Sequence, residues 1–171
     1  MSTLLPRVRE LSYEICKEHF QKGGTRHQIT SNLSLVKGVL GFHLLRRGRV
    51  ILSFYEDSVS TQHCGIKTWN KSICKILNRY FKAVQFEMRD GLPYAKFRGF
   101  SILLSPGTKV DPINFAKELA RQCYKQLKLG IKVPQDCERL VCEGATGNSI
   151  AAIALLDYLD EYPECDPRRA L

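Results

Sequence analysis

The sequence predicts an α+β fold: a mostly antiparallel sheet of about four strands with helices on one face, in the order α-β-β-α-β-β-α-α. Two pairs of apolar runs, each pair joined by a short polar link with a glycine, predict two β-hairpins. Segments whose apolar residues recur at helical spacing precede, separate and follow these pairs. The 171 residues correspond to one ordinary domain, which buries roughly 70% of the unfolded chain's surface without needing a metal or a disulfide.

The chain opens with a predicted amphipathic helix over residues 4–21, where apolar side chains recur near helical spacing between charged ones. Gly23 and Gly24 end this helix. Residues 25–32 are polar, and we expect them to form a loop.

The first hairpin joins two β-compatible runs, residues 38–45 and 50–55. A short basic link with a glycine lies between them. Strands in these positions place Arg46, Arg47 and Arg49 at one rim of the sheet.

The clearest amphipathic helix covers residues 70–82. Its apolar side chains lie on one side, and on another side cations follow at i, i+4, i+8 and i+11: Lys71, Lys75, Arg79 and Lys82. The first three cations extend over about 12 Å of helix axis, enough to follow several phosphates of one strand. Residues 58–86 contain no Asp or Glu, whereas a face that serves only solubility usually mixes both signs. We therefore predict phosphate contacts, with a solvated helix face as the alternative.

A second hairpin is predicted from residues 84–89 and 94–104, joined by an Asp-Gly turn. Alternation places Lys96 and Arg98 on one face of its second strand, and Gly99 indicates a bulge. Lys, Arg and Ser side chains on a sheet donate to phosphates and bond to ribose 2′-hydroxyls, which distinguishes A-form RNA without reading its sequence. An edge strand that its cations protect from aggregation is the alternative.

Two further helices are predicted near the end of the chain. The first covers residues 112–127, with Asp111 as its cap and Pro112 at the favoured first position. A loop follows, and residues 148–162 form a last, more uniformly apolar helix.

Charge divides the chain into two predicted parts. Residues 1–132 carry 23 basic and 9 acidic side chains, and form a basic α+β body that binds RNA. Residues 133–171 carry 3 basic and 8 acidic side chains, and form an acidic helical segment and tail packed on the body or extending from it. The net charge of +9 indicates a polyanionic partner for the body, and an ordinary protein of high pI is the alternative.

Composition also limits the class of protein. No apolar run approaches the roughly 18 to 20 residues that span a bilayer, so we expect no membrane partner. Residues 1–10 lack the apolar core of a secretory signal. Seven cysteines, an odd number, then predict reduced thiols in the cytoplasm or the nucleus.

Signatures of catalysis are scarce, and we predict no enzyme, cofactor or metal site. The histidines lack metal-ligand spacing, and Cys137 and Cys142 lack a second close pair. The Gly144–Ser149 loop precedes a helix, where it either cradles a phosphate or supplies a helix cap at its end. A small nucleic-acid enzyme that uses His63, Cys64 or this loop remains a rival hypothesis.

The string Lys96-Phe-Arg-Gly-Phe-Ser-Ile-Leu-Leu-Ser-Pro-Gly107, followed by a predicted helix, resembles the tombusvirus small silencing suppressors. Those proteins have a similar arginine-phenylalanine-arginine-glycine strand that ends in serine and glycine before a long helix. Gly48-Arg-Val-Ile-Leu-Ser-Phe-Tyr55 is similar to their early strand, and Lys67-Thr-Trp-Asn-Lys-Ser72 to the tryptophan-containing start of their middle helix. The resemblance covers about residues 48–128, and residues 1–44 do not match.

The resemblance implies a homodimer whose joined sheets cradle short double-stranded RNA. The protein would then be a viral suppressor of RNA silencing that sequesters small interfering RNA whatever its sequence. Carried over to this chain, Lys96, Arg98, Ser101 and Ser105 lie on the sheet side, and Arg49 and Lys71 at the phosphates. The complete set of predicted RNA contacts is Arg46, Arg47, Arg49, Lys67, Lys71, Lys75, Arg79, Lys96, Arg98, Ser101 and Ser105.

Aromatic residues are candidates for stacking on the ends of the duplex. The family brackets these ends with tryptophans from an N-terminal region, but the single tryptophan here is Trp69. Tyr13, Phe20 and Phe42 are the other candidates, and core packing is the alternative role of each.

A different class of function is also open. The acidic end and the apolar last helix, Ile150 to Leu159, would form a non-enzymatic adaptor that docks a host factor such as a silencing protein. The basic body would then only aid solubility.

Overall fold

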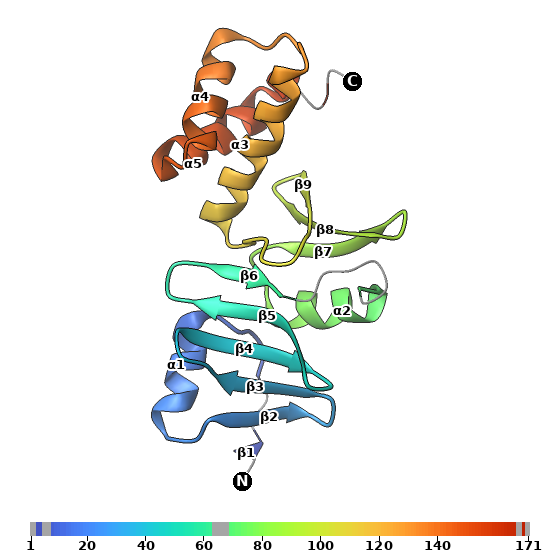
Figure 1. The fold of residues 1–171 in the computed structure, drawn as a ribbon, viewed down its shortest axis with the longest axis vertical. Helices are drawn as coiled ribbons and strands as arrows, with labels where there is room; N and C mark the ends of the chain where they lie inside the picture. Colours follow the sequence, from blue (N-terminus) through green and yellow to red (C-terminus); the bar gives the residue numbers. More distant parts are fainter. Residues whose placement is uncertain (1–2, 5–7, 63–68, 167–168, 170–171) are drawn as a thin grey trace. The chain divides into compact units, whose positions relative to one another are not determined.

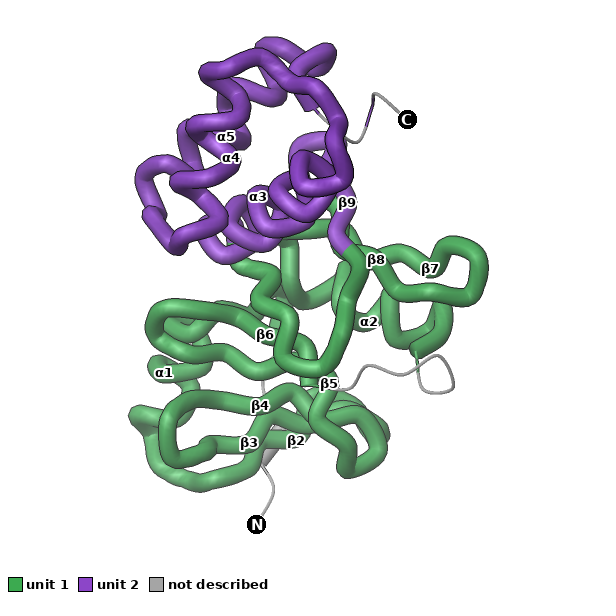
Figure 2. Tube along the Cα trace, turned by 45° about the horizontal axis from the view of Figure 1, so that its top comes forward, with its two compact units in different colours: residues 1–96, 103–111 green, residues 97–102, 112–171 purple. Residues whose placement is uncertain are grey.

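The computed structural model describes residues 3–4, 8–62, 69–166 and 169. Two compact units divide the chain: residues 1–96 with 103–111, and residues 97–102 with 112–171 (Figure 2). The α+β class and the mostly antiparallel pairing are confirmed. The predicted single sheet of about four strands and the predicted element order match only roughly, because the described strands form two sheets (Figure 1).

The larger sheet belongs to the first unit and has six strands in sequential order. Its strands are β1 (Thr3–Leu4), β2 (Arg26–Thr30), β3 (Leu33–Lys37), β4 (Gly41–Arg46), β5 (Arg49–Tyr55) and β6 (Val59–Thr61). Among the described strand pairs of this sheet, only β1 and β2 run parallel. The hairpin of β4 and β5 is as predicted.

The prediction of a loop over residues 25–32 is wrong, because most of this segment forms β2, and β3 was not predicted at all. A strand at the side of a sheet needs only one buried face to pack. His27 supplies a buried ring in β2, and Leu33 and Leu35 are buried in β3. The polar side chains of β2 hide this pattern.

Two helices complete the first unit. Helix α1 (Tyr13–Gln21) begins later than predicted because the Ser12 hydroxyl accepts a hydrogen bond from the Ile15 amide (3.2 Å), which caps the helix there. Helix α2 (Lys71–Tyr80) agrees with the prediction. Its cap is Asn70, whose side-chain oxygen accepts from the Ile73 amide (2.9 Å).

The smaller sheet contains β7 (Gln85–Arg89), β8 (Leu92–Phe97) and β9 (Phe100–Leu103). The predicted hairpin is present, but its second strand is split in two. Arg98 (φ 51°) and Gly99 (φ 82°) form a two-residue turn instead of a bulge. Two consecutive residues with positive φ are what a tight hairpin turn requires, so β8 reverses directly into β9.

Helices dominate the second unit, which contains α3 (Pro112–Lys128), α4 (Gln135–Ala145), α5 (Ser149–Glu161) and a short 3₁₀ turn at Pro163–Cys165. Helix α4 lies where the sequence predicted a loop. Its buried side chains are few and small, Cys137 and Val141 together with Gly144, so its apolar stripe is weak in sequence. The two units also differ from the charge-based division at residue 132, because α3 packs against α4 and α5.

In the first unit, the Asn78 side chain of α2 makes two hydrogen bonds to the backbone of β7. The Asn78 amide oxygen accepts from the Phe86 amide (2.6 Å), and the Asn78 amide nitrogen donates to the Phe86 carbonyl (2.9 Å). Leu77 and Phe86 are buried beside this contact. The side chain therefore pairs the backbone of β7 as a neighbouring strand would.

Replacing this side chain tests its role in stability. We expect Asn78→Ala to lower the free energy of unfolding by about 1–3 kcal/mol, because both Phe86 backbone groups lose their partner. Urea denaturation followed by circular dichroism measures the change in the free energy of unfolding. The control is Gln85→Ala, at an exposed position of β7 next to Phe86. Equal stabilities of the two variants would contradict the assignment.

Candidate nucleic-acid interface

The tip of the β4–β5 hairpin carries three of the predicted cations. Arg46 and Arg49 face each other across the last pair of the ladder, and Arg47 (φ 49°) and Gly48 (φ 77°) form the turn. The Arg47 amide donates to the Asn32 carbonyl (2.8 Å), which joins the tip to the turn between β2 and β3. The backbone therefore holds this basic tip beside a polar turn.

Helix α2 reaches the same place. The Arg46 guanidinium donates through Nη2 to the Ser72 hydroxyl (3.0 Å). Ser72 lies in the first turn of α2, between the predicted phosphate contact Lys71 and the buried Ile73. The hairpin tip and the basic helix, separate in sequence, thus form one surface.

A hollow of about 250 Å³ lies at this junction. Two arginines, Arg46 and Arg79, line it together with the polar side chains of Thr30, Asn32 and Ser72. Three apolar residues complete the lining, and among the described residues no acidic side chain takes part in it. The Arg79 guanidinium carbon lies 5.6 Å from the centroid of the Tyr80 ring, which supports the arginine from one side. Two guanidinium groups beside hydroxyl and amide groups favour an anion, and phosphate above all.

Further cations lie on the two elements that meet at this hollow, helix α2 and the tip of the β4–β5 hairpin. Lys71 and Lys75 are exposed, as are Arg47 and Arg49 at the hairpin tip. Within the part of the chain that the structure describes, none of these four side chains has an ion-pair partner. Their charges are therefore available to an external anion. We refer to Arg46, Arg47, Arg49, Lys71, Lys75 and Arg79 together as the basic surface.

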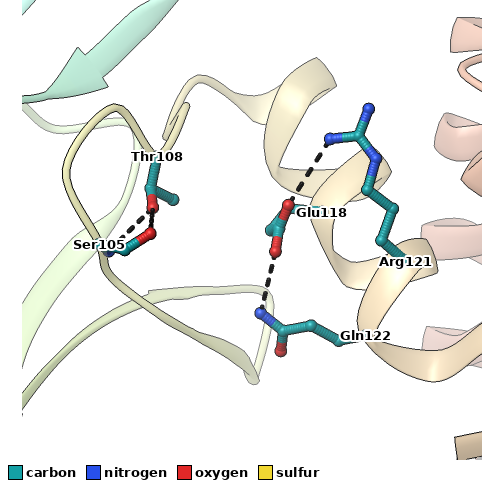
Figure 3. A network of polar contacts seen from close by, with 5 residues as sticks. All are labelled: Ser105, Thr108, Glu118, Arg121 and Gln122. Carbon is teal, nitrogen blue, oxygen red and sulfur yellow. Dashed lines mark hydrogen bonds and ion pairs between the residues drawn. The ribbon is translucent and has the colours of Figure 1, made fainter. Parts of the chain in front are cut away.

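The predicted RNA contacts of the second hairpin do not form a comparable cluster of unpaired cations. Lys96 is exposed in β8, in the first unit, and Ser101 is half-buried in β9, in the second. The Ser105 hydroxyl lies 2.9 Å from the Thr108 hydroxyl, and the Ser105 amide donates to the same oxygen (2.9 Å; Figure 3). Ser105 therefore shapes the loop after β9.

Arg98 has an internal role that its place in the sequence did not predict. Its guanidinium donates to Asp157 of α5 (2.7 Å) and also pairs with Asp160 one turn later. The hydrogen bond to Asp157 raises the pKa of Arg98, and the charge of Asp160 adds to the effect. Two carboxylates already neutralise this cation, so we remove it from the phosphate contacts.

The aromatic candidates for end stacking lie largely in the core. Trp69 is 3% exposed and packs near Phe86, with ring centroids 6.2 Å apart. Phe42 is 6% exposed, and its ring centroid lies 5.5 Å from that of Tyr13 and 5.3 Å from that of Phe20, between α1 and β4. Buried rings present no free face to a base pair, so core packing describes Trp69, Phe20 and Phe42, whereas Tyr13 is half-buried.

The remaining candidates for chemistry are limited. Lys67, His63 and Cys64 lie outside the described residues. In the loop before α5, the Asn148 side-chain oxygen accepts from the Ile150 and Ala151 amides (3.1 Å each), so the cap alternative is confirmed. Among the described residues, no three His, Cys, Asp or Glu side chains are grouped to hold a metal, and no helix is long and apolar enough to cross a membrane.

Comparisons of this chain with known protein families, with curated proteins and with solved structures give no match. No relative therefore supplies a function or a set of site residues. The resemblance to the tombusvirus suppressors stays a prediction, and the site is defined by the contacts described above.

Three polar members of the hollow were not predicted from the sequence. Thr30 and Asn32 lie in a segment that was expected to be a loop, and Ser72 lies between the cations of α2. A signal for Ser72 exists, because residues 72, 76 and 79 recur at helical spacing on one side of α2. Nothing in the sequence indicates that the β2–β3 turn meets this side.

The role of Arg98 can be tested by removing its side chain. We expect Arg98→Ala to leave the affinity for duplex RNA unchanged and to reduce stability by up to about 1 kcal/mol, since the ion pairs are half-exposed. Fluorescence anisotropy with labelled duplex and thermal unfolding measure the two effects. A substantial loss of affinity with an unchanged melting temperature would return Arg98 to the set of RNA contacts.

Proposed function

We propose that this protein binds short double-stranded RNA by charge and shape, independently of sequence. The observation that carries the proposal is the hydrogen bond from Arg46 to Ser72, which joins the cations of the β4–β5 hairpin to those of α2. Six cations then share one surface, and no described acidic residue lines the hollow between them. Such a surface suits a polymer of phosphates better than a single small anion.

The energetics of such binding are dominated by counterion release. Each phosphate that a cation neutralises contributes roughly −0.7 to −0.9 to the slope of log affinity against log salt. Engagement of most of the basic surface therefore gives a steep salt dependence. Thr30, Asn32 and Ser72 line the hollow together with the arginines. Their hydroxyl and amide groups are of the kind that bonds to ribose 2′-hydroxyls beside the phosphates.

The biological role that we propose follows the resemblance to the tombusvirus suppressors. A dimer of this chain would sequester small interfering RNA in the cytoplasm or the nucleus of a host cell, and so suppress RNA silencing. No catalytic step is part of this proposal. The alternative adaptor function through the last helix has less support, because Leu155, Leu156 and Leu159 of α5 are buried within the second unit. Among the described residues of α5, Ile150 and Ile153 are the large apolar side chains left exposed for a partner.

The basic face of α2 provides the direct test. We expect the triple variant Lys71→Glu, Lys75→Glu and Arg79→Glu to lose duplex RNA binding at moderate salt, because attraction becomes repulsion along the whole helix face. A gel-shift series with duplex RNA, duplex DNA and single strands, at two salt concentrations, measures the effect. The wild-type protein should prefer duplex RNA, and its affinity should fall steeply as the salt concentration increases.

A matched control separates the effect of charge on the basic surface from the effect of the protein's net charge. Lys17→Glu, Lys22→Glu and Lys132→Glu make the same change in net charge at exposed positions outside the basic surface. This control should bind at least several times more tightly than the α2 variant, and circular dichroism should show both to be folded. A folded α2 variant that still shifts duplex RNA at low salt would overturn the proposal.

A further inference from the structure

Helix α3 carries a second cationic stripe with the same spacing as the one on α2. Its members are Lys117, Arg121, Lys125 and Lys128, at i, i+4, i+8 and i+11. The surroundings differ from those of α2, because the last three cations border a groove between α3 and α4 within the second unit. This groove has no part in the RNA surface proposed above.

The groove has a volume of about 540 Å³. Its α4 side is lined by small residues, Cys142, Ala145 and the adjoining Thr146. Gly144 explains why the helices can pack closely at its edge, since a Cβ added there would lie 2.8 Å from the Ala120 Cβ. The two helices are in close contact at Gly144, and the neighbouring side chains of α4 are small. Together these features leave an open trough along α3.

The α3 side of the groove combines charge with an aromatic ring. The Lys128 ammonium lies 4.7 Å from the centroid of the Tyr124 ring. Arg121 pairs with Glu118 (3.6 Å), which also accepts from the Gln122 amide (3.4 Å; Figure 3). Lys125 has no acidic partner within the described residues. The rim is therefore positive, and the ring of Tyr124 lies along it.

We propose that this groove is the docking site of a short acidic peptide segment of a partner protein. An apolar side chain of the peptide occupies the trough against Tyr124, Cys142 and Ala145, and its carboxylates meet Lys125 and Lys128 at the rim. From Glu118 to Lys128 the helix axis extends about 15 Å, the length of four or five extended residues. The volume lies within the range of sites that enclose a small ligand or a few side chains.

Charge and shape together favour a peptide over nucleic acid. A phosphate backbone uses the cations but leaves the apolar trough empty. An acidic peptide with an apolar anchor uses both features, and its backbone amides can donate to Glu118. This complementarity is what distinguishes the α3 stripe from the α2 stripe.

Selection of peptides from a random library tests this proposal, because it does not require the partner protein to be identified first. A phage-displayed library of random twelve-residue peptides is panned on the full-length protein. We expect enrichment of sequences in which Asp or Glu lies close to Leu, Phe or Tyr. A synthetic peptide of the enriched sequence should bind about tenfold more weakly to the Arg121→Glu and Lys125→Glu double variant, and equally well to a Lys17→Glu and Lys22→Glu control.

Cys142 gives a second readout at the groove itself. The other described cysteines are buried, and burial raises the pKa of the thiols of Cys16 and Cys137 to about 12. In a Cys64→Ser background, N-ethylmaleimide should therefore modify Cys142 first. Bound peptide should protect Cys142 from modification, and modification of Cys142 before the peptide is added should prevent binding.

Two outcomes overturn the proposal. In the first, the selection enriches no peptide sequence, or the enriched peptides bind equally well after the charge reversal and after modification of Cys142. In the second, the selection yields no peptide and the Arg121→Glu and Lys125→Glu variant loses affinity for duplex RNA. That result would show that the cations of α3 bind nucleic acid. Since the α2 variants test RNA binding separately, either proposal can fail without the other.

Discussion

The candidate site depends on one constraint, the attachment of the β4–β5 hairpin tip to helix α2. Like charges repel, so the approach of a hairpin with three arginines to a helix with three cations has an electrostatic cost that a specific contact helps to offset. The Arg46 to Ser72 hydrogen bond supplies that contact, and the Arg47 to Asn32 backbone bond holds the hairpin tip beside the β2–β3 turn. The Arg46 to Ser72 bond joins two basic segments into one surface, with a hollow at their junction.

Helix α2 is suited to this position because its other sides are fixed. Ile73, Leu77 and Tyr80 are buried, so the helix cannot rotate without exposing them. Asn78 holds it against the backbone of β7. With these faces fixed, the cations keep one direction, and a rigid arrangement of charges costs less entropy when a duplex binds. The second unit shows the contrasting use of a cation, since Arg98 is held by two carboxylates of α5.

The sequence predicted the elements with strong local patterns. Helix α2 and both hairpins have clear periodicity or turn residues. The predicted positions of α2 and of the first hairpin agree with the structure, whereas the second strand of the second hairpin is divided into β8 and β9. Strand β2 and helix α4 were missed because few of their residues are buried, so tertiary pairing decides their conformation. Likewise, the cations of the site were visible in the sequence, whereas Thr30 and Asn32 were not. Their position depends on a long-range contact that no local pattern encodes.

The most direct test of the basic surface is a double-mutant cycle of duplex RNA binding with Arg46→Ala and Arg79→Ala, measured over a range of salt concentrations. Both arginines line one hollow, so we expect them to share a phosphate. Each single variant should then bind more weakly, with a salt slope reduced by about 0.7–0.9, and the two losses should not add. Unchanged slopes, or losses that add fully, would contradict a shared phosphate site at the junction of the hairpin and the helix.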